Sequence, residues 1–239
     1  MLLLYTIPIP LLLLLALTLL PPQNRHKTHP LILGFAISLL LTTFLTDIIK
    51  DAVGRPRPDL LDRCQPRADA PPTDLVTVAI CTETRHHRLH DGFRSFPSGH
   101  SSLAWASMTW TALFLASQTH VFRPRASLAA VLVCIAPLVG AALIAASRLE
   151  DYRHDVGDVI AGSLIGFGVA YMNWRRYWPS LAARDCDEPY SLSDGGRGRS
   201  SPGGGFRRVR DEEDGMGDER ERFSIGDDGG GGLSRERGR

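Results

Sequence analysis

Long apolar stretches alternate with polar ones over the first three quarters of this 239-residue chain. Five windows contain at most one Asp, Glu, Lys or Arg each, and each is long enough, as a helix, to cross the hydrocarbon core of a bilayer, which takes about 20 residues. These windows run over residues 1–20, 30–49, 101–121, 126–146 and 156–174. The pattern therefore predicts an all-α protein, a polytopic transmembrane helical bundle with about five spans.

The first apolar window also resembles a secretory signal peptide, so the two readings have to be separated. No basic residue precedes its apolar run, and the pair Pro21-Pro22 is followed by no small-residue cleavage pattern. A cleaved signal peptide normally has both a basic segment before its apolar run and a small-residue cleavage pattern after it. We therefore interpret residues 1–20 as a retained transmembrane helix.

The last quarter of the chain has a different composition from the rest. From about Pro189 on it consists mainly of Gly, Ser, Arg, Asp and Glu, with glycine runs at 203–205 and 229–232 and few large apolar residues. Such a segment buries too little apolar surface to offset the entropy of ordering. We expect a membrane-embedded domain over residues 1–178 and a disordered tail over residues 179–239. Charge adds little, because 27 Lys+Arg nearly balance 26 Asp+Glu.

Three polar clusters lie at the ends of predicted spans, over residues 50–58, 96–100 and 147–158. With five spans, the loops alternate between the two membrane faces, so all three clusters share one face. Ionisable side chains at a membrane boundary are costly unless they have partners or a function. The shared face is therefore the place to expect a functional site.

The first cluster carries two cations, Lys50 and Arg57. Pro56 and Pro58 stop the preceding helix and impose an extended course, so the two side chains can approach one anion from different directions. The alternative is that both simply reach toward lipid headgroups, as basic residues at span ends commonly do.

The second cluster, Phe96-Pro97-Ser98-Gly99-His100, immediately precedes a predicted span. Free backbone N–H groups and the helix dipole favour an anion there, Gly99 permits close approach, and the Ser98 hydroxyl can add a hydrogen bond. Ser98 as an ordinary helix cap is the alternative. His100 favours the functional reading, because an imidazole can protonate a leaving oxygen near neutral pH.

The third cluster combines Arg148, His154 and Asp158. His154 and Asp158 are four residues apart, so they can lie on one face of a helix. The carboxylate would then hold one ring nitrogen and leave the other free as a nucleophile. Arg148 adds a permanently charged fork suited to phosphate oxygens. The alternative is a capping acid beside a surface histidine.

Together the clusters predict a phosphoryl-transfer site, which needs positioning and electrostatic stabilisation of spread negative charge. The sequence has no Walker loop, no dense carboxylate set for Mg²⁺ and no Cys/His spacing typical of zinc. We therefore expect a reaction without metal or other cofactor. Cys64 and Cys81, in the loop between the first two clusters, either form a disulfide in an oxidising compartment or remain free thiols.

These residues resemble the type-2 phosphatidate phosphatases, also called lipid phosphate phosphatases, which share a site with bacterial acid phosphatases and vanadium haloperoxidases. The family motif K-x6-R-P is matched by Lys50 with Arg57-Pro58, P-S-G-H by Pro97 to His100, and S-R-x5-H-x3-D by Ser147-Arg148, His154 and Asp158. Three ordered motifs with correct spacing are specific, unlike any one alone. The span layout looks most similar to fungal diacylglycerol pyrophosphate phosphatases.

The resemblance implies a role for each matched residue. His154 would attack phosphorus and form a phosphohistidine, with Asp158 orienting it and His100 protonating the leaving group. The remaining matched residues would hold the phosphate oxygens: Lys50, Arg57, Ser98, Gly99 and Arg148.

The resemblance also implies a topology. The site would face the lumen of an endomembrane compartment, vacuole or endoplasmic reticulum, and the tail would lie in the cytosol. Lipid-active members usually have six spans with the first motif after the third, whereas here it follows the second. We therefore expect that this chain lacks the family's first helix.

We accordingly expect a multi-pass membrane hydrolase of phosphatidate and diacylglycerol pyrophosphate, acting in phospholipid metabolism. Its partners would be the lipid phosphate substrate and the membrane, with no nucleic acid, and the sequence sets no expectation for an oligomeric state. Two alternatives stay open. A polyisoprenyl diphosphatase would keep the same catalytic residues, and a non-catalytic scaffold would bind lipid headgroups without turnover.

Overall fold

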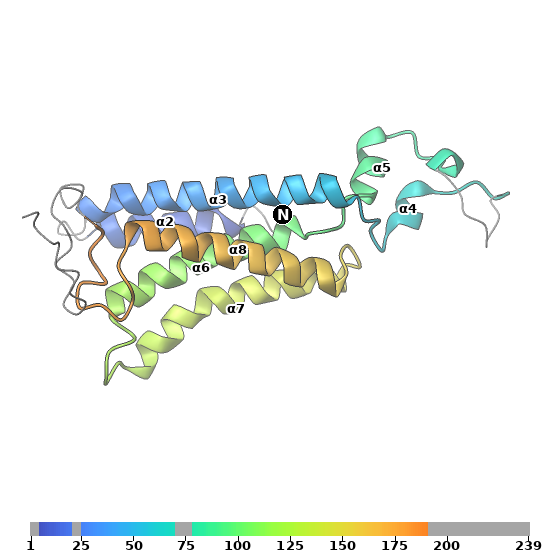
Figure 1. The fold of residues 1–239 in the computed structure, drawn as a ribbon. Coiled ribbons are helices and arrows are strands. Elements are labelled where there is room, and N and C mark those ends of the chain that lie inside the picture. The colour runs from blue at the N-terminus through green and yellow to red at the C-terminus, as the bar shows by residue number, and fades with distance from the viewer. Residues whose placement is uncertain (1–4, 21–24, 70–77, 191–239) are drawn as a thin grey trace, which may run out of the picture. The chain divides into compact units, whose positions relative to one another are not determined.

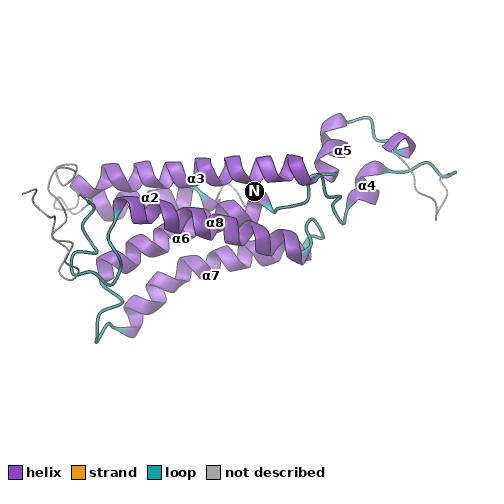
Figure 2. Cartoon of the chain, in the orientation of Figure 1, coloured by secondary structure: helices purple, strands orange, loops and turns teal. Residues whose placement is uncertain are grey.

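The computed structural model describes residues 5–20, 25–69 and 78–190, and the regular structure in these ranges is helical (Figure 2). Its elements are α2 (Pro8–Leu19), α3 (Arg25–Val53), α4 (Leu60–Cys64), the 3-10 turn η2 (Val78–Ile80), α5 (His86–Gly92), α6 (Gly99–Thr119), α7 (Leu128–Glu150) and α8 (Val156–Tyr177). Extended backbone in the described ranges forms only an isolated bridge between Pro66 and Cys81. The predicted all-α fold is confirmed.

Helices occupy all five windows predicted from the apolar pattern (Figure 1). Three of them are long and apolar enough to cross a membrane, namely α3 with 29 residues, α7 with 23 and α8 with 22. Helix α2 has only 12 described residues, and α6, although 21 residues long, carries many Ser and Thr side chains. The chain is therefore a membrane protein, with three helices that qualify as spans by length and hydropathy in the described ranges.

Helix α6 is the centre of the bundle and packs along α8, α7 and α3. An aromatic cluster joins these helices. The ring centroids of Trp110 and Trp174 lie 5.3 Å apart, and those of Trp174 and Trp178 lie 4.4 Å apart. All three rings are fully buried. Large aromatic surfaces of this kind contribute strongly to packing, and α6 is the long helix with the most buried residues.

Two glycines of α8 set how closely that helix approaches α6. A Cβ atom on Gly162 would lie 2.4 Å from the Ser98 carbonyl oxygen, and one on Gly166 would lie 2.1 Å from the Ser102 carbonyl oxygen. Real Cβ atoms do not come so near, so only glycine fits. The contact places the start of α8 directly against the start of α6.

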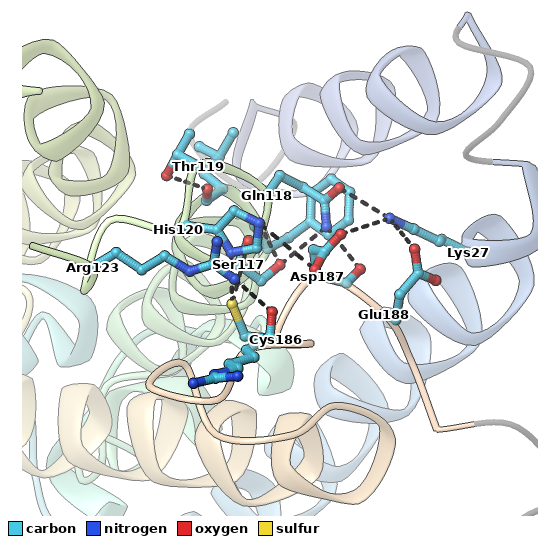
Figure 3. Close-up of polar contacts among 12 residues, drawn as sticks. Lys27, Ser117, Gln118, Thr119, His120, Arg123, Cys186, Asp187 and Glu188 are labelled. Carbon is cyan, nitrogen blue, oxygen red and sulfur yellow. Dashed lines mark hydrogen bonds and ion pairs between the residues drawn. The ribbon is translucent and has the colours of Figure 1, made fainter. Parts of the chain in front are cut away.

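Residues 179–190 follow α8 and pack against the end of the bundle at which α8 ends. Lys27 of α3 is 3% exposed, and its Nζ lies 3.0 Å from Glu188 Oε1 and 3.6 Å from Asp187 Oδ2 (Figure 3). Cys186 is fully buried beside His120, with its Sγ 3.1 Å from His120 Nδ1. The packed part of the chain thus extends to Tyr190, past the boundary expected at residue 178. The rest of the predicted disordered tail, residues 191–239, lies outside the described residues.

Candidate active site

Lys50 and Gly99 come together where α3 ends and α6 begins. A Cβ on Gly99 would lie 3.3 Å from Lys50 Nζ, so the ammonium sits beside the first turn of α6. The first backbone N–H groups of a helix have no intrahelical acceptor. No residue in the described ranges forms an ion pair or hydrogen bond with Lys50 Nζ, which leaves its charge available to an anion at this helix terminus.

Arg57 is held in place from the loop side. Its Nε donates to the Asp91 carbonyl oxygen at 2.8 Å, and its Nη2 donates to Asp91 Oδ1 at 2.9 Å. Arg63 binds the other carboxylate oxygen of Asp91, also at 2.9 Å. Burial lowers the pKa of Arg57, but an arginine stays protonated in a protein. Asp91 in α5 therefore fixes the direction in which Arg57 presents its charge.

Ser98 and His100 occupy the start of α6. The Ser98 N–H donates to the Asp158 carbonyl oxygen at 2.9 Å, which docks the second motif on the third. The cations Arg148, Lys50 and Arg57 act electrostatically on the His100 imidazole, and Arg153 acts on it more weakly. The fold thus gathers the three predicted phosphate-binding cations around one of the two predicted catalytic histidines.

His154 lies just before α8, whose N-cap is Asp155. Its Nδ1 is 3.6 Å from Asp158 Oδ2, beyond an ordinary hydrogen bond, and 3.5 Å from Ser95 Oγ. Ser95 Oγ in turn donates to Asp158 Oδ2. The sequence led us to expect a direct hydrogen bond between the His154 imidazole and Asp158, whereas in the structure the Ser95 hydroxyl lies beside both groups. In either case Nδ1 faces the acid, and Nε2 is not engaged by it.

Arg55 also holds Asp158, from the side away from His154. Its Nη1 donates to Asp158 Oδ1 at 3.0 Å and its Nη2 donates to Asp155 Oδ2 at 2.8 Å. The Asp155 N–H donates to Asp158 Oδ2 at 3.1 Å, completing a capping box. Asp158 is fully buried, so these bonds compensate the cost of placing a carboxylate there.

The surroundings of His154 keep its imidazole neutral. Burial and then the positive charge of Arg57 lower its pKa below the usual range, and together they outweigh the opposing effect of Asp158. A neutral imidazole keeps the lone pair that a nucleophile needs.

Arg148 completes the set of cations from the last turn of α7. It is 7% exposed. Its Nη2 lies 2.9 Å from Asp151 Oδ2, and its Nε and Nη2 donate to Ser147 Oγ at 3.2 and 3.1 Å. Arg148 is therefore anchored by its neighbours and still acts on His100.

A family model for the PAP2 superfamily matches residues 31–181, well over half of the chain. The chain belongs to the PAP2 superfamily. The matched range contains every residue that the sequence predicted for the site. No solved structure matches the chain.

Curated proteins similar to this chain include several from fungi and plants. The chain is 40% identical over 185 residues to "Diacylglycerol pyrophosphate phosphatase 1" of Saccharomyces cerevisiae, which covers 76% of this chain and 64% of the relative. It is 42% identical to "Probable diacylglycerol pyrophosphate phosphatase 1" of Schizosaccharomyces pombe, over 66% of this chain and 57% of the relative. It is 39% identical to "Lipid phosphate phosphatase 2" of Arabidopsis thaliana, over 66% and 54%. The chain thus spans between 54% and 64% of the lengths of these relatives.

Three residues of this PAP2 site were not predicted: Arg55, Ser95 and Asp91. Arg55 lies within Gly-Arg-Pro-Arg-Pro, where the fixed family positions drew attention to Arg57 instead. Ser95 and Asp91 lie in the long loop and have no spacing signal relative to the residues they contact. The pattern Asp155-x-x-Asp158 could have been found, because an acid three residues after an N-cap is typical of a capping box.

The loop before α6 is closed by a disulfide between Cys64 and Cys81, one of the two states that the sequence allowed. The bridge joins the end of α4 to the segment that leads into α5. Glu83, two residues further on, accepts hydrogen bonds from Arg85, which lower its pKa to about 2. The loop that presents Asp91 to Arg57 is thereby tied at several points.

Proposed function

We propose that this PAP2 protein hydrolyses lipid phosphates, among them phosphatidate and diacylglycerol pyrophosphate, through a phosphohistidine at His154. One observation carries the proposal: a neutral, buried imidazole turns its Nδ1 to Ser95 and Asp158 beside a helix N-terminus where the Lys50 ammonium forms no ion pair or hydrogen bond with a described residue. The names of the fungal and plant relatives support the substrate class.

In the first step, Nε2 of His154 attacks phosphorus, and the bond from phosphorus to the leaving oxygen breaks. His100 donates a proton to that oxygen, so that the lipid departs as an alcohol or as a lipid monophosphate. Lys50, Arg57 and Arg148 stabilise the charge spread over the transferred group, together with the Ser98 hydroxyl and the Gly99 N–H.

In the second step, His100, now neutral, accepts a proton from water, and the water oxygen attacks the phosphohistidine. The bond from phosphorus to nitrogen breaks, inorganic phosphate leaves and His154 returns to its neutral form. Asp158 keeps the imidazole in one orientation through both steps, and no metal takes part.

We also propose that the site faces the lumen of an endomembrane compartment, vacuole or endoplasmic reticulum. Disulfides persist in oxidising compartments, and the Cys64–Cys81 bridge lies in the loop that supplies Arg57 and Asp91. That argument favours a luminal loop, and the tail would then begin on the cytosolic side.

The test is phosphate release from phosphatidate and diacylglycerol pyrophosphate in mixed micelles with excess EDTA. The His154→Ala variant removes the nucleophile, and His87→Ala, an exposed histidine of α5, is its matched control. We expect metal-independent release by the unaltered chain and by His87→Ala, and none above background by His154→Ala. A requirement for Mg²⁺ would contradict the mechanism.

The same assay separates the two alternatives. Release only from a dolichyl or undecaprenyl diphosphate would replace the proposed substrates by polyisoprenyl diphosphates. A folded chain that binds lipid phosphates but releases nothing from any of them would be a scaffold.

A further inference from the structure

An apolar groove lies between α6 and α7, away from the candidate active site. It encloses about 370 Å³, within the size range of small-ligand sites. One wall is a face of α6 with Thr109, Ala112 and Ala116, the other is a face of α7 with Val131, Cys134 and Leu138, and Phe167 of α8 also contributes to the lining. Val121, Phe122 and Leu181 line its far end. With this lining, the groove suits a hydrocarbon chain.

The groove lies too far from the candidate active site for the acyl chains of a substrate bound there to fill it. At 1.5 Å per residue, Thr109 lies about 14 Å along α6 from His100, and Ala116 about 24 Å. On α7, Leu138 lies about 15 Å from Arg148. One leaflet of hydrocarbon is roughly 15 Å thick, half the bilayer core. A lipid whose phosphate is at the candidate site therefore extends only to the entrance of the groove, which faces the opposite leaflet.

The far end of the groove is bordered by positive charge. Arg123 and Arg125 lie in the loop at residues 120–127, directly after Val121 and Phe122, and that loop contains no acidic residue. Arg184 follows Leu181, and Arg123 donates a hydrogen bond to its carbonyl oxygen. All three side chains belong to exposed residues, and none has an ion-pair partner within the described ranges. Of the nearby acids, Asp187 and Glu188 are engaged by Lys27, and Asp185 adjoins Arg184 in sequence.

We propose that this groove and its arginines form a second lipid site, for an anionic phospholipid of the leaflet opposite the candidate active site. One acyl chain would fill the groove between α6 and α7. The phosphodiester headgroup would lie against Arg123 and Arg125, where guanidinium groups bind phosphate oxygens well. The site differs from the candidate active site in leaflet and in ligand, and it does not depend on the proposed reaction.

The test uses the full chain in nanodiscs that contain phosphatidylglycerol with a photoactivatable group near the end of one acyl chain. This lipid is a phosphodiester, with no terminal phosphate for the proposed reaction. Phosphatidylcholine with the same photoactivatable chain is the neutral comparison. We expect phosphatidylglycerol to label the groove-lining parts of α6 and α7 about five-fold more than phosphatidylcholine, the effect of one arginine on an anionic headgroup.

Two sets of variants decide whether the labelling reports this site. Ala116→Trp fills the groove and should abolish labelling of its walls, whereas Leu40→Trp, at an exposed position of α3, a helix that lines no part of the groove, should not. Arg123→Gln with Arg125→Gln should remove the preference for phosphatidylglycerol. Arg176→Gln, an exposed arginine in the last turn of α8, should preserve it. The arginine variants replace only exposed side chains and remove at most one exposed hydrogen bond, from Arg123 to the Arg184 carbonyl oxygen, so they decide the matter even if Ala116→Trp does not fold.

Equal labelling by the two lipids, or labelling unchanged in the arginine variants, would mean that only ordinary surrounding lipid was detected and would overturn the proposal. So would formation of a Cys134–Cys134 disulfide between copies under mild oxidation, because a second copy of the chain would then cover the groove.

Discussion

The two ends of the bundle each contain a mostly buried lysine of α3, but their surroundings differ. At one end, Lys27 is surrounded by acceptors, with Glu188 Oε1 at 3.0 Å and Gln118 Oε1 at 3.5 Å (Figure 3). At the other end, Lys50 has no hydrogen-bond or ion-pair partner in the described ranges and lies beside the N-terminus of α6. A buried charge held by direct partners is part of the structure. Lys50 is less deeply buried than Lys27, and Asp47 and Asp91 act on it only from a distance, so its ammonium is available to an anionic ligand.

The strongest test of this difference is to replace each lysine by methionine. For Lys50→Met we expect phosphatase activity to fall by about 10²-fold or more, since removing one charge-stabilising donor costs that much. Thermal stability should stay equal or rise, because a partly buried cation with no direct partner among the described residues is gone. For Lys27→Met we expect the reverse, with stability lower by about 1–2 kcal/mol and activity per folded molecule unchanged. Activity assays and thermal melts of both variants check the pair, and equal loss of activity in both would remove the distinction.

Removing the guanidinium of Arg55 should have the next largest effect. With Arg55→Gln, Asp158 and Asp155 each lose an ion-paired contact and His154 its fixed orientation, so we expect kcat to fall by roughly 10- to 10²-fold. The pH profile should also change. The pKa of His154 is lowered in the native protein, and an Asp158 carboxylate without Arg55 would favour the imidazolium more, so the acid limb of kcat/KM should move to higher pH.

A shift in the pH profile of kcat/KM would distinguish a positioning role of Arg55 from general damage to the fold. Ionisation of the substrate is common to both proteins and cancels in the comparison. Arg55→Lys keeps the charge but not both contacts, and it should restore the acid limb with part of the rate. An unshifted profile in Arg55→Gln would argue against a role for Arg55 in setting the state of His154.

A smaller effect is expected from Gly99→Ala. The added Cβ would be 3.3 Å from Lys50 Nζ, and displacing the ammonium by a few tenths of an ångström should lower kcat/KM by about ten-fold, or about 1.4 kcal/mol. Gly140→Ala is the matched control, since nothing lies within 4 Å of its Cβ position. It should leave activity unchanged, and the helix of Gly140→Ala should be slightly more stable. Equal kcat/KM values for Gly99→Ala and Gly140→Ala would show that the activity does not depend on the space between Gly99 and the Lys50 ammonium.

The smallest effect concerns acid at the Lys27 end. Burial alone would raise the pKa of Glu188, but hydrogen bonds from His26 and Lys27 hold it below its usual value of 4.5. The ionised form therefore stabilises the native state above pH 4.5, and this contribution disappears as the pH falls through the lower native pKa. Glu188→Gln should lower the free energy of unfolding at pH 7 by less than about 1 kcal/mol, and Tm should fall slightly with it. Thermal melts of the variant and the unaltered chain should converge in acid.

Sequence-based prediction was most successful where the information is local. The helix pattern located α3, α6, α7 and α8 within a few residues, because apolar composition and Pro or Gly stops act over neighbouring positions. Ser98, Gly99 and His100 do lie at the start of α6. The boundary at residue 178 fell short because Cys186 and Asp187 have no periodic pattern, and their packing depends on His120 and Lys27 far away in sequence.

The sequence by itself determined the class of protein, the position of its helices and the chemical types available at one membrane face. Only the tertiary structure decided which charges are partnered. Arg55 meets Asp158 across 103 residues, and Ser95 meets it across 63. Such pairs form because Gly162 and Gly166 let α8 approach α6 closely. A hydrogen bond depends on distances of a few tenths of an ångström, and spacing along the chain does not specify these between separate helices.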